Sequence, residues 1–340
     1  MTTVNQAVAV LKHGGLIIYP TETTYGVGVD ATNQQAVNKL AQYKKRPLGK
    51  PYSIAICDLE MAQNYVDINP AALNLYKTLL PGPLTVISTG KHLVARGVES
   101  ETGTLGVRMP DYPLVLNIIK QFGKPITATS ANASYQKRPY KIDDVLDNLS
   151  EKQKKLIDLI IDVGELPHNE PSTVIDTTLD DPVILRQGEI KLSDKTEILS
   201  RGEENTQNIG KELLQKYASY LGKRPLIFAL EGKMGVGKTQ FTKGVAKALG
   251  IKETIVSPTY NLVQEYSRLT HIDAWRINST ADFEALGINK YLSDKSILCI
   301  EWAEKVQDII RSYHDEAIIV WVKISYGQGE NERLLSWGNI

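Results

Sequence analysis

The chain has 340 residues, and its 39 basic and 39 acidic side chains leave a formal net charge of zero at pH 7. This length is too great for one typical core and predicts two domains, while 42% hydrophobic and 23% charged residues are ordinary for a soluble globular protein. The balance of charge excludes a polycationic nucleic-acid binder, so any contact with nucleic acid must come from a local patch.

Two cysteines occur, Cys57 and Cys299, and each stands alone in an apolar run. This pattern predicts neither a disulfide framework nor a zinc site, and we expect two core thiols in a reducing compartment. Residues 4–12 have the pattern of a helix rather than of a signal peptide. No apolar run approaches the ~20 residues that cross a bilayer. The sequence therefore predicts a cytoplasmic protein with no membrane segment.

The first predicted elements are the helix at 4–12 and a strand at 16–20, which opens the segment LIIYPTETTYGVG. Hydroxyl groups crowded at a strand end beside glycines can line a small-molecule pocket. A second helix has apolar residues at helical spacing from Ala36, and it should stop near Arg46 because Pro47 follows.

Positive charge gathers at the end of this second helix, where Lys44, Lys45 and Arg46 are followed after a turn by Lys50. Cations at a helix C-terminus are favourable by ~0.3–1 kcal/mol each, so charge alone favours a merely stabilising role. Four later segments, PGPLTVI, TLGVRMP, PITATSAN and PSTVID, change this interpretation because they place polar residues at strand ends. Arg108 of TLGVRMP has apolar neighbours, and a charged group there is costly unless it meets an anion.

Seven segments, YPTETTYGVG, KKRPLGKP, PGPLT, GVRMP, TSAN, PSTVID and LRQG, occur in the order found in the YrdC/TsaC family of threonylcarbamoyl-AMP synthases. The resemblance spans about residues 4–190 and implies an α/β domain with a twisted, open, mixed sheet. Family members combine L-threonine, bicarbonate or CO₂, and ATP to give threonylcarbamoyl adenylate and pyrophosphate. The resemblance thus implies an L-threonylcarbamoyladenylate synthase, which is a nucleotidyltransferase.

The resemblance also implies which residues act. For ATP these are Lys44, Arg46, Lys50, Thr104, Asn132 and Arg186, of which Lys44 and Arg46 are expected to be catalytic. For L-threonine they are Thr23, Arg108, Ser130 and Ser172, with Arg108 pairing to the carboxylate. A carbamate oxygen must attack the α-phosphate in line while pyrophosphate leaves, so such a site mainly positions anions and neutralises charge. No covalent nucleophile is required.

The chain departs from this family at several positions. Ala55 is found where long-form members carry a histidine, and Gln187 makes LRQG of the usual LRPG. After TSAN the chain reads ASYQKRPYKI, which leaves open whether Tyr140 or a neighbour supplies an ATP contact. The basic and tyrosine residues of this stretch could also touch RNA, although a solvated loop is the simpler interpretation. His168, in polar surroundings, is expected at the surface.

After Gly188 the apolar pattern lapses into a polar stretch, which predicts a domain boundary. A helix with apolar residues at helical spacing is predicted at 206–221. We expect a synthase-like domain over residues 1–190, a linker over 191–204 and a second domain over 205–340.

The strongest motif lies in LIFALEGKMGVGKTQFT, where Gly232, Gly237, Lys238 and Thr239 fit the pattern G-x-x-x-x-G-K-[ST]. Glycines let backbone N–H groups surround a triphosphate, and the following helix points its positive end at the anion. The lysine then reaches the β/γ-phosphates and the threonine hydroxyl is offered to Mg²⁺. An apolar run before the loop and a helical pattern after it supply the context. A glycine-rich turn with a chance Lys-Thr is the alternative.

A buried strand predicted at 297–300 delivers Glu301 at its carboxyl end. An acid opposite a phosphate loop is the usual second anchor for Mg²⁺, although an acid after an apolar strand is a weak signal by itself. A further strand is predicted at 318–324. Loop and acid together predict a nucleotide site in the second domain.

The segments SPTY, HIDAWR and EWAE follow this loop at the spacing of TsaE, the small P-loop ATPase of bacterial tRNA threonylcarbamoylation. The resemblance covers about residues 200–340 and implies a P-loop NTPase-type α/β domain with a parallel sheet. It implies Mg²⁺ bound by Thr239 and Glu301, catalysis by Asp273 and Glu301, and a switch loop at Ser257–Tyr260. The remaining ATP-binding residues that it implies are Thr206, Gly232, Gly235, Val236, Gly237, Lys238, Trp302 and Arg333.

This half departs from its family too, with Lys233, Gln240, Trp275 and Ala303 at positions where other residues are usual. None of these changes removes a charge that a Mg²⁺–ATP site needs. For His271 and Asp273, a helix cap or a turn pair is the alternative role.

Together the two resemblances predict a bifunctional tRNA-modification enzyme. The first domain would form the adenylate, and the second would hydrolyse ATP to reset a TsaB/TsaD-type complex that makes N6-threonylcarbamoyladenosine in tRNA. No motif for that transfer appears, so separate partners are implied, and tRNA contact would be indirect or through a weak basic patch. The alternatives are a P-loop kinase, whose Arg-rich lid is not evident after Glu301, and an RNA-binding scaffold.

Overall fold

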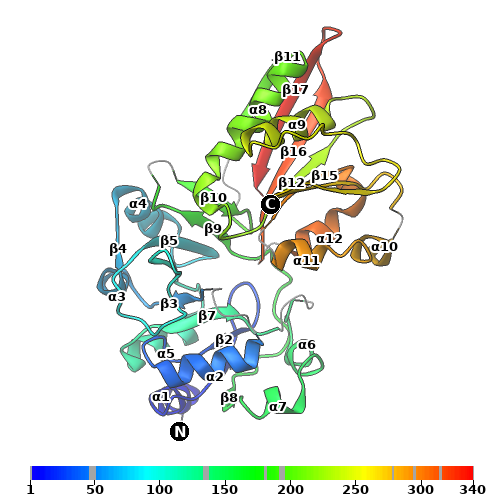
Figure 1. Cartoon of the computed structure of the whole chain (residues 1–340). Coiled ribbons are helices and arrows are strands. Elements are labelled where there is room, and N and C mark those ends of the chain that lie inside the picture. The colour runs from blue at the N-terminus through cyan, green and yellow to red at the C-terminus, as the bar shows by residue number, and fades with distance from the viewer. Residues whose placement is uncertain are drawn as a thin grey trace. The chain divides into compact units, whose positions relative to one another are not determined.

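The computed structural model (Figure 1) describes residues 2–45, 51–132, 138–179, 182–190, 196–277, 279–293, 296–313 and 316–339. The chain divides into two compact units, Met1–Lys191 and Leu192–Ile340, and each has its own sheet. Within the described ranges, no helix combines the length and the apolar character needed to span a membrane.

The first unit alternates short helices and strands. Its described helices are α1 (Thr3–Lys12), α2 (Gln34–Lys44), α3 (Leu59–Tyr65), α4 (Pro70–Leu79), α5 (Pro113–Phe122), α6 (Ile142–Leu146) and α7 (Glu151–Lys154). Its described strands are β1 (Ile17–Tyr19), β2 (Gly26–Gly28), β3 (Ser53–Ala55), β4 (Val66–Asp67), β5 (Leu84–Gly90), β6 (Thr104–Arg108), β7 (Ile126–Ser130), β8 (Leu159–Ile160), β9 (Thr173–Asp176) and β10 (Val183–Arg186).

These strands form one mixed sheet in the order β10-β9-β5-β6-β3-β7-β2-β1-β8, with β4 paired to β5. The pairs β5/β9, β3/β6 and β1/β8 are parallel. The pairs β1/β2, β2/β7, β3/β7, β4/β5, β5/β6 and β9/β10 are antiparallel. The mixed sheet expected for the first domain is confirmed.

Helices α1 and α5 pack on this sheet through apolar stripes. In α1, the buried Val4, Ala7, Val8 and Leu11 recur every three or four positions, as in an amphipathic helix. They join a core cluster with residues of α5 and with Ile126 of β7. The periodicity that predicted a helix at the N-terminus is therefore confirmed, and its physical origin is burial of one face.

The end of α2 determines where Lys44 lies. Tyr43 is fully buried, and its hydroxyl donates to the Ala131 carbonyl oxygen at 2.7 Å. Lys45 follows with φ of 47° and closes the helix. The last turn of α2 is thereby held beside the carboxyl end of β7, while residues 46–50 lie outside the described part of the chain.

The second unit contains a sheet of fewer but mostly longer strands, with helices on both of its faces. Its described helices are α8 (Glu203–Lys216), α9 (Lys238–Ala248), α10 (Thr280–Glu284), α11 (Ile288–Ser293) and α12 (Gln307–Ser312), with 3₁₀ turns η1 (Ala218–Tyr220) and η2 (Ala303–Val306). Its described strands are β11 (Thr196–Arg201), β12 (Leu226–Glu231), β13 (Val263–Glu265), β14 (Leu269–Asp273), β15 (Ile297–Glu301), β16 (Ile318–Tyr326) and β17 (Glu332–Asn339).

The second sheet has the strand order β11-β17-β16-β12-β15-β14-β13. Its centre, β16-β12-β15-β14, is parallel. Both edges are antiparallel, through β17 and β11 on one side and β13 on the other. The parallel sheet predicted for this domain is confirmed for the centre, and the predicted strands at 297–300 and 318–324 are β15 and β16.

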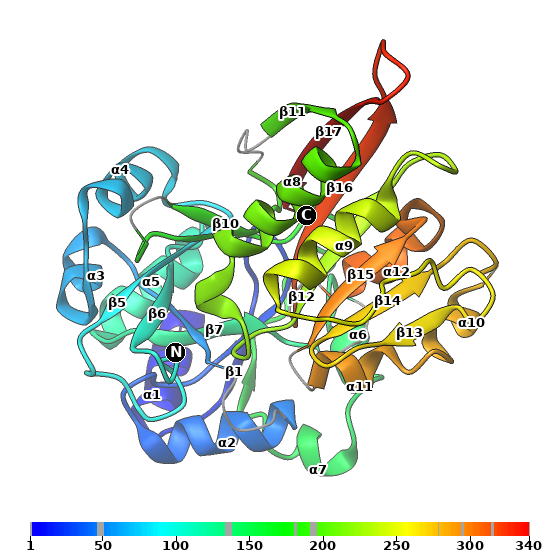
Figure 2. The ribbon, with the colours of Figure 1, turned by 45° about the horizontal axis from the view of Figure 1, so that its top comes forward.

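Strand β12 is buried on both faces, with α8 and α9 over one face and α11 and α12 over the other (Figure 2). Phe228 of β12 meets Phe241 of α9 edge to face, with ring centroids 5.5 Å apart. On the opposite face, Ile227 and Ala229 join a core cluster with α11 and α12. Because successive strand residues point to opposite faces, a doubly covered strand reads as a continuous apolar run.

The linker expected over residues 191–204 is wrong for its second half. Thr196–Arg201 is β11, an edge strand antiparallel to β17, and α8 already begins at Glu203. The sequence does not predict this strand, because it has no alternating pattern and its apolar residues Ile198 and Leu199 are both exposed.

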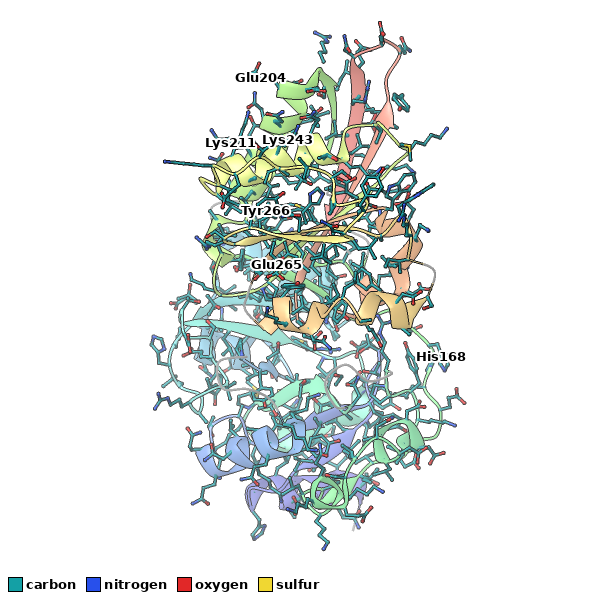
Figure 3. All side chains as sticks on the ribbon, turned by 45° about the vertical axis from the view of Figure 1, so that its right-hand side comes forward. His168, Glu204, Lys211, Lys243, Glu265 and Tyr266 are labelled. Carbon is teal, nitrogen blue, oxygen red and sulfur yellow. The ribbon has the colours of Figure 1, made fainter. Side chains whose placement is uncertain are left out.

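Helices α8 and α9 pack closely, and Figure 3 places Lys211 of α8 and Lys243 of α9 on these neighbouring helices. Their approach requires Gly244, because a Cβ there would lie 1.9 Å from the Gln207 carbonyl oxygen. The contact brings Thr206, in the first turns of α8, toward the loop that precedes α9. The helix predicted at 206–221 corresponds to α8, which begins and ends earlier.

The two cysteines are free thiols in different surroundings. Cys299 of β15 is fully buried, as expected. Cys57 is only partly buried, which corrects the expectation of a core thiol, and its Sγ donates to Oδ2 of Asp58 at 3.2 Å. Burial and the neighbouring Asp58 carboxylate raise the pKa of Cys57 to about 11, so this thiol is protonated near neutral pH.

Candidate functional sites

Lys44 directs its ammonium at the carboxyl end of β7. Its Nζ donates to the carbonyl oxygens of Ser130 at 2.8 Å and of Asn132 at 2.5 Å, and only 5% of the residue is exposed. Three residues predicted for the synthase site are thereby brought together. Arg46 and Lys50, which were predicted to bind ATP with Lys44, lie outside the described residues.

Arg108, at the end of β6, forms an ion pair with Glu22. Its Nη2 lies 2.7 Å from Oε1 of Glu22 and 3.4 Å from Oγ1 of Thr23. The two charged side chains are 16% and 14% exposed, so the pair is largely removed from water. The anion that the apolar neighbours of Arg108 require is thus present in the chain itself, and it brings the predicted residues Arg108 and Thr23 together.

Glu22 and Thr23 belong to a fixed loop between β1 and β2. Oγ1 of Thr21 accepts hydrogen bonds from the backbone N–H groups of Thr23 and Thr24, both at 3.2 Å, and donates to the Thr24 carbonyl at 2.7 Å. Nδ2 of Asn169 donates to the Glu22 carbonyl at 2.9 Å. Side-chain bonds to the backbone restrict such a loop, so its side chains project from a defined position.

A pocket lies beside the ion pair. Its lining is formed by Arg108 and by mostly small or hydroxyl-bearing residues: Tyr19, Thr21, Thr24, Gly26, Ala55, Pro110, Ala128, Thr129 and Ser130. Burial raises the pKa of Tyr19, while Arg108 and Glu22 act on it in opposite directions. Its hydroxyl therefore stays protonated and donates to the Thr127 carbonyl at 3.2 Å. The pocket combines one cation with several neutral hydrogen-bonding groups.

Ser172 and Arg186 meet on the β9 side of the same sheet. Nε of Arg186 donates to the Ser172 carbonyl oxygen at 2.7 Å. Oγ of Ser172 is buried and has no hydrogen-bond partner among the described residues. Gly188 of the LRQG segment donates its N–H to Oγ1 of Thr173 at 2.9 Å, so the segment contacts PSTVID although Gln187 replaces the usual proline.

Thr104 and Arg108 lie at opposite ends of β6, about 13 Å apart along an extended strand. The Thr104 hydroxyl is 2.8 Å from Oγ of Ser100. The described contacts join Thr104 to neither the Lys44 nor the Arg108 group, and its role in ATP binding stays a prediction.

Tyr140 is packed against its own unit rather than presented to solvent. Its ring stacks on that of His168, labelled in Figure 3, with centroids 4.2 Å apart, and its hydroxyl donates to the Asn169 carbonyl at 3.0 Å. Only 8% of Tyr140 is exposed, which leaves no face for stacking on an RNA base. The surface position expected for His168 is confirmed. Tyr135 and Lys137, which belong to the same basic and tyrosine-bearing stretch, lie outside the described residues.

The second site lies where β12 leads into α9. Gly232, Gly235 and Gly237 adopt φ of 149°, 72° and 108°, a region that side-chain-bearing residues rarely enter. Gly232 also lies against β16, where a Cβ would be 2.3 Å from the Ile324 carbonyl oxygen. The strand and the helix that the phosphate-loop motif needs are both present.

Lys238 begins α9 and is only 4% exposed. Its Nζ donates to the carbonyl oxygens of Gly232 at 2.7 Å and Lys233 at 3.0 Å, and lies 4.0 Å from the centroid of a Trp302 ring. Burial lowers the pKa of Lys238, and three neighbouring carboxylates oppose that shift. The ammonium is held inside the loop that the motif predicts to surround phosphates.

Glu301, at the end of β15, is held from two sides. Thr239 in the first turn of α9 donates its hydroxyl to Oε1 of Glu301 at 2.7 Å, and Nε2 of His271 lies 2.9 Å from the same oxygen. His271 is fully buried, and its Nδ1 has no hydrogen-bond partner within the described ranges. This arrangement is that of an imidazole donating its Nε2–H to a carboxylate.

The oxygens of Thr239 and Glu301 form a donor set that fits Mg²⁺. The ion prefers hard oxygen ligands and commonly takes one or two from the protein while phosphates supply others. No group of three or more His, Cys, Asp or Glu side chains placed to hold a metal occurs in the described part of the chain. A hydroxyl and a carboxylate 2.7 Å apart at a phosphate loop suit an ion shared with a nucleotide.

Asp273 ends β14 and pairs in register with Glu301 of β15. Its Oδ2 accepts hydroxyl hydrogens from Thr259 at 2.7 Å and Ser257 at 3.3 Å, and its Oδ1 accepts the N–H of Trp275 at 2.9 Å. The turn role considered for Asp273 is therefore present at Trp275. The other oxygen ties the predicted switch loop to the end of the strand.

Trp302 lies beside Lys238 with an unusual backbone. Its φ of 57° is in the left-handed region, which costs a non-glycine residue ~1–3 kcal/mol. Its indole is 4.4 Å from that of Trp275, centroid to centroid. Strain of this kind is maintained where the surrounding structure fixes a side chain, here over the loop lysine.

Thr206, Val236 and Arg333 support the loop from behind. Thr206 is 2% exposed, its hydroxyl lies 2.8 Å from Oγ of Ser200, and its methyl would be 3.9 Å from a Cβ on Gly237. Nε of Arg333 donates to the carbonyl oxygen of the buried Val236 at 3.1 Å. All three therefore lie beside the loop or belong to it, and their nucleotide-binding roles stay predictions.

The sequence patterns gave no role to Glu22 or Glu304, and they placed His271 in the HIDAWR segment without saying what it contacts. Glu304 follows Trp302 in EWAE, and its Oε2 is buried without a hydrogen-bond partner among the described residues. Burial raises the pKa of Glu304, and Glu231 adds to this while Lys238 opposes it. Each missed residue lies inside a recognised motif, and this membership was the one available signal.

Two family models match the chain. The model for Sua5, YciO and YrdC, described as "Telomere recombination", matches residues 9–188. The model described as "Threonylcarbamoyl adenosine biosynthesis protein TsaE" matches residues 200–334.

Individual proteins are similar to this chain over about half of its length or more. The threonylcarbamoyl-AMP synthase of Bacillus subtilis is 36% identical over 187 residues, which are 54% of this chain and 53% of that protein. The putative threonylcarbamoyl-AMP synthase of Methanocaldococcus jannaschii is 32% identical over 184 residues, 54% of this chain and 84% of that protein. The crystal structure of P. abyssi Sua5 complexed with L-threonine matches in fold, with a TM-score of 0.55 and 23% identity over 95% of this chain and 96% of that one. The first match covers more than half of this chain, and with the second it shows that the protein belongs to the Sua5/YciO/YrdC family, with a TsaE module joined after it.

Proposed function

We propose that the first unit is a threonylcarbamoyl-AMP synthase, which converts L-threonine, bicarbonate and ATP to threonylcarbamoyl adenylate, pyrophosphate and water. The observation that carries the proposal is the contact of Lys44 with the backbone of Ser130 and Asn132, beside a pocket that Ser130 and Arg108 line. The family membership and the similarity to threonylcarbamoyl-AMP synthases support the same reaction.

In this proposal the chain binds two anions and positions them. The Lys44 ammonium exchanges its two carbonyl partners for phosphate oxygens, which are charged and therefore stronger acceptors, with Arg46 and Lys50 beside it. Arg108 binds the threonine carboxylate, and the hydroxyl of Ser172, which has no hydrogen-bond partner among the described residues, is available to the substrate. The threonine amine adds to bicarbonate with loss of water to give the carbamate. A carbamate oxygen then attacks the α-phosphorus in line while the bond to pyrophosphate breaks, and cations neutralise the charge that builds on pyrophosphate.

The remaining predicted contacts of this site are proposals of the same kind. Thr23 and Ser130 would hold threonine, while Thr104, Asn132 and Arg186 would complete the ATP site. Thr104 is the least supported of these because its described contact is with Ser100.

Product analysis with ¹³C-bicarbonate tests this function. The chain is incubated with ATP, L-threonine and labelled bicarbonate, and adenylates are identified by mass spectrometry. We expect an adenylate that carries the label and forms only when all three substrates are present. An adenylate that lacks the label, or that forms without threonine, would contradict the proposal.

We propose further that the second unit hydrolyses ATP. The supporting observation is the 2.7 Å bond from Thr239 to Glu301 at the mouth of a loop that already encloses Lys238. Thr239 and Glu301 would hold Mg²⁺, which when bound neutralises phosphate charge. Lys238 exchanges loop carbonyls for the β/γ-phosphates, Trp302 covers it, and Asp273 links hydrolysis to the switch loop.

The two activities would serve one cytoplasmic pathway. The adenylate is a carrier of a threonylcarbamoyl group, and transfer to adenosine in tRNA requires a separate protein of the TsaB/TsaD type. In that scheme the ATPase resets the transferase complex, and tRNA contact with this chain is indirect.

Reconstitution with a TsaB/TsaD pair tests this role of the second unit. We expect repeated rounds of tRNA modification with the wild-type chain and a single round with Lys238→Ala. Repeated rounds with Lys238→Ala would contradict it.

A further inference from the structure

We propose that the Arg108–Glu22 ion pair is the resting form of a site for the zwitterion of a free α-amino acid, in which Arg108 takes the carboxylate and Glu22 takes the ammonium. The inference rests on the proposed function, which supplies an amino acid as substrate. It gives Glu22 a role in recognition that neither the charge pattern nor the motif assigned to it.

Only one of the two carboxylate oxygens of Glu22 has a hydrogen-bond partner among the described residues. Its Oε1 accepts from Nη2 of Arg108 at 2.7 Å, whereas its Oε2 is buried and has no hydrogen-bond partner among the described residues. A buried acceptor without a donor is unfavourable, and more so when it is charged. A substrate ammonium carries three donors and would satisfy this oxygen.

Arg108 is also only partly used. Both of its hydrogen bonds come from Nη2, to Glu22 and to Thr23, so Nε and Nη1 donate to no atom of the described ranges. A guanidinium binds a carboxylate best through two parallel N–H···O bonds. Arg108 lines the pocket and retains the donors that such a contact needs.

The two charged side chains come from different structural elements, and this arrangement suits a zwitterion. The ammonium and carboxylate of an α-amino acid are bonded to the same carbon, so their site needs a cation and an anion a few ångströms apart. Arg108 comes from β6, and Glu22 comes from a loop whose backbone Thr21 and Asn169 hold in place. The opposed charges are therefore held by different elements, so rotation of the two side chains would separate them and admit a substrate.

The ion pair also allows the site to discriminate between amino acids and simple carboxylic acids. A simple carboxylic acid would take Glu22's place on Arg108 and leave the Glu22 carboxylate buried and unpaired, which is strongly unfavourable. An amino acid replaces both partners at once, so neither charge is left uncompensated. The site would thus select amino acids over hydroxy acids and other simple anions.

Calorimetric binding of two ligands to the full chain tests this inference. The ligands are L-threonine and β-hydroxybutyrate, which has hydrogen in place of the ammonium. Hydrogen bonds to charged groups contribute enough that wild type should prefer L-threonine by about 10- to 100-fold. In Glu22→Gln, which keeps the size and removes the charge, L-threonine should bind more weakly and β-hydroxybutyrate more tightly, because Arg108 no longer has an internal anion.

Two further variants control for folding and for charge. Glu22→Asp keeps the carboxylate and should keep most of the preference. Glu165→Gln removes a surface carboxylate that is 63% exposed and should leave both affinities unchanged. Thermal unfolding establishes that each variant is folded.

The directions in which Glu22→Gln changes the affinities for L-threonine and β-hydroxybutyrate decide whether the inference holds. Equal weakening of both ligands in Glu22→Gln would mean that Glu22 merely holds Arg108 in place, and equal tightening would make it a blocking group, so either result overturns the inference. If the wild-type chain binds no L-threonine, the proposed function and the inference fail together. If wild type binds L-threonine and Glu22→Gln keeps the full preference, the inference fails alone.

Discussion

Nε2 of His271 lies 2.9 Å from Oε1 of Glu301, the same oxygen that accepts the Thr239 hydroxyl at 2.7 Å. The histidine comes from β14, the glutamate from β15 and the threonine from α9, so three elements determine the orientation of one carboxylate. Glu301 is a proposed Mg²⁺ ligand, and partners of this kind set the orientation of a ligand that touches the metal.

The first prediction concerns this positioning. His271→Ala should weaken Mg²⁺-dependent nucleotide binding by about 10- to 100-fold, since loss of an outer partner has effects of that size. Titration of Mg²⁺ against a fluorescent ATP analogue measures it. His271→Gln, which retains an N–H donor, should lose less, and the exposed His168→Ala serves as control. An unchanged Mg²⁺ midpoint in His271→Ala would show that the histidine has no part in holding Glu301.

The second prediction concerns the contact of α8 with α9. A Cβ on Gly244 would lie 1.9 Å from the Gln207 carbonyl oxygen, and the resulting overpacking should cost Gly244→Ala ~1–3 kcal/mol of unfolding free energy. Gly338→Ala is the matched control, because nothing lies within 4 Å of its added Cβ.

Urea unfolding followed by tryptophan fluorescence measures this effect. All 4 tryptophans of the chain occur after residue 274, so the signal reports on the second unit. If Gly244→Ala and Gly338→Ala unfold at the same urea concentration, the close helix contact is not what stabilises this unit.

The third prediction concerns how the stability of the second unit changes with pH. Burial raises the pKa of Glu304, with Glu231 adding to the shift, so the folded unit binds this proton more tightly than the unfolded chain does. The folded state then carries more protons between the ordinary value and the raised one, and stability falls as pH rises through that window. Glu304→Gln removes the titration, so its stability relative to wild type should improve from pH 4 to pH 7.5.

The same fluorescence assay at several pH values measures this difference. Glu330→Gln, at an exposed position in the same unit, should show no such trend. A stability difference between Glu304→Gln and wild type that is constant with pH would mean that Glu304 ionises without penalty in the folded unit.

The fourth prediction separates the two sites. Lys44→Ala combined with Arg46→Ala should reduce threonine-dependent pyrophosphate release at least ~100-fold, because removing one stabilising donor already costs about that much. Phosphate release by the second unit should remain. Lys238→Ala should have the reverse effects, and loss of both activities in either variant would argue against independent sites.

The elements that could be predicted from the sequence are those whose burial produces a regular pattern of apolar residues. Helix α1 buries one face, so Val4, Ala7 and Leu11 appear at helical spacing. Strand β15 is buried throughout and appears as an apolar run before Glu301. Strand β11 lies at an edge with Ile198 and Leu199 exposed, so its existence depends on pairing with β17 rather than on a local pattern.

The sites show the same division. Motifs pointed to Lys44, Arg108, Lys238 and Glu301 as candidates because residue type and spacing carry the chemistry, and their roles stay predictions. They could not indicate the roles of Glu22 or His271. Those roles depend on which side chain faces which across the β1–β2 loop and the β14–β15 pair, and this is determined by tertiary packing.

The most direct test of the central claim is pyrophosphate release from ATP by the whole chain, measured with and without L-threonine and bicarbonate. We expect release that requires both substrates and that persists in Lys238→Ala, because all the residues proposed for the synthase site belong to the first unit. Release that does not depend on threonine, or no release from chain shown to be folded, would contradict the assignment of the first unit as a threonylcarbamoyl-AMP synthase.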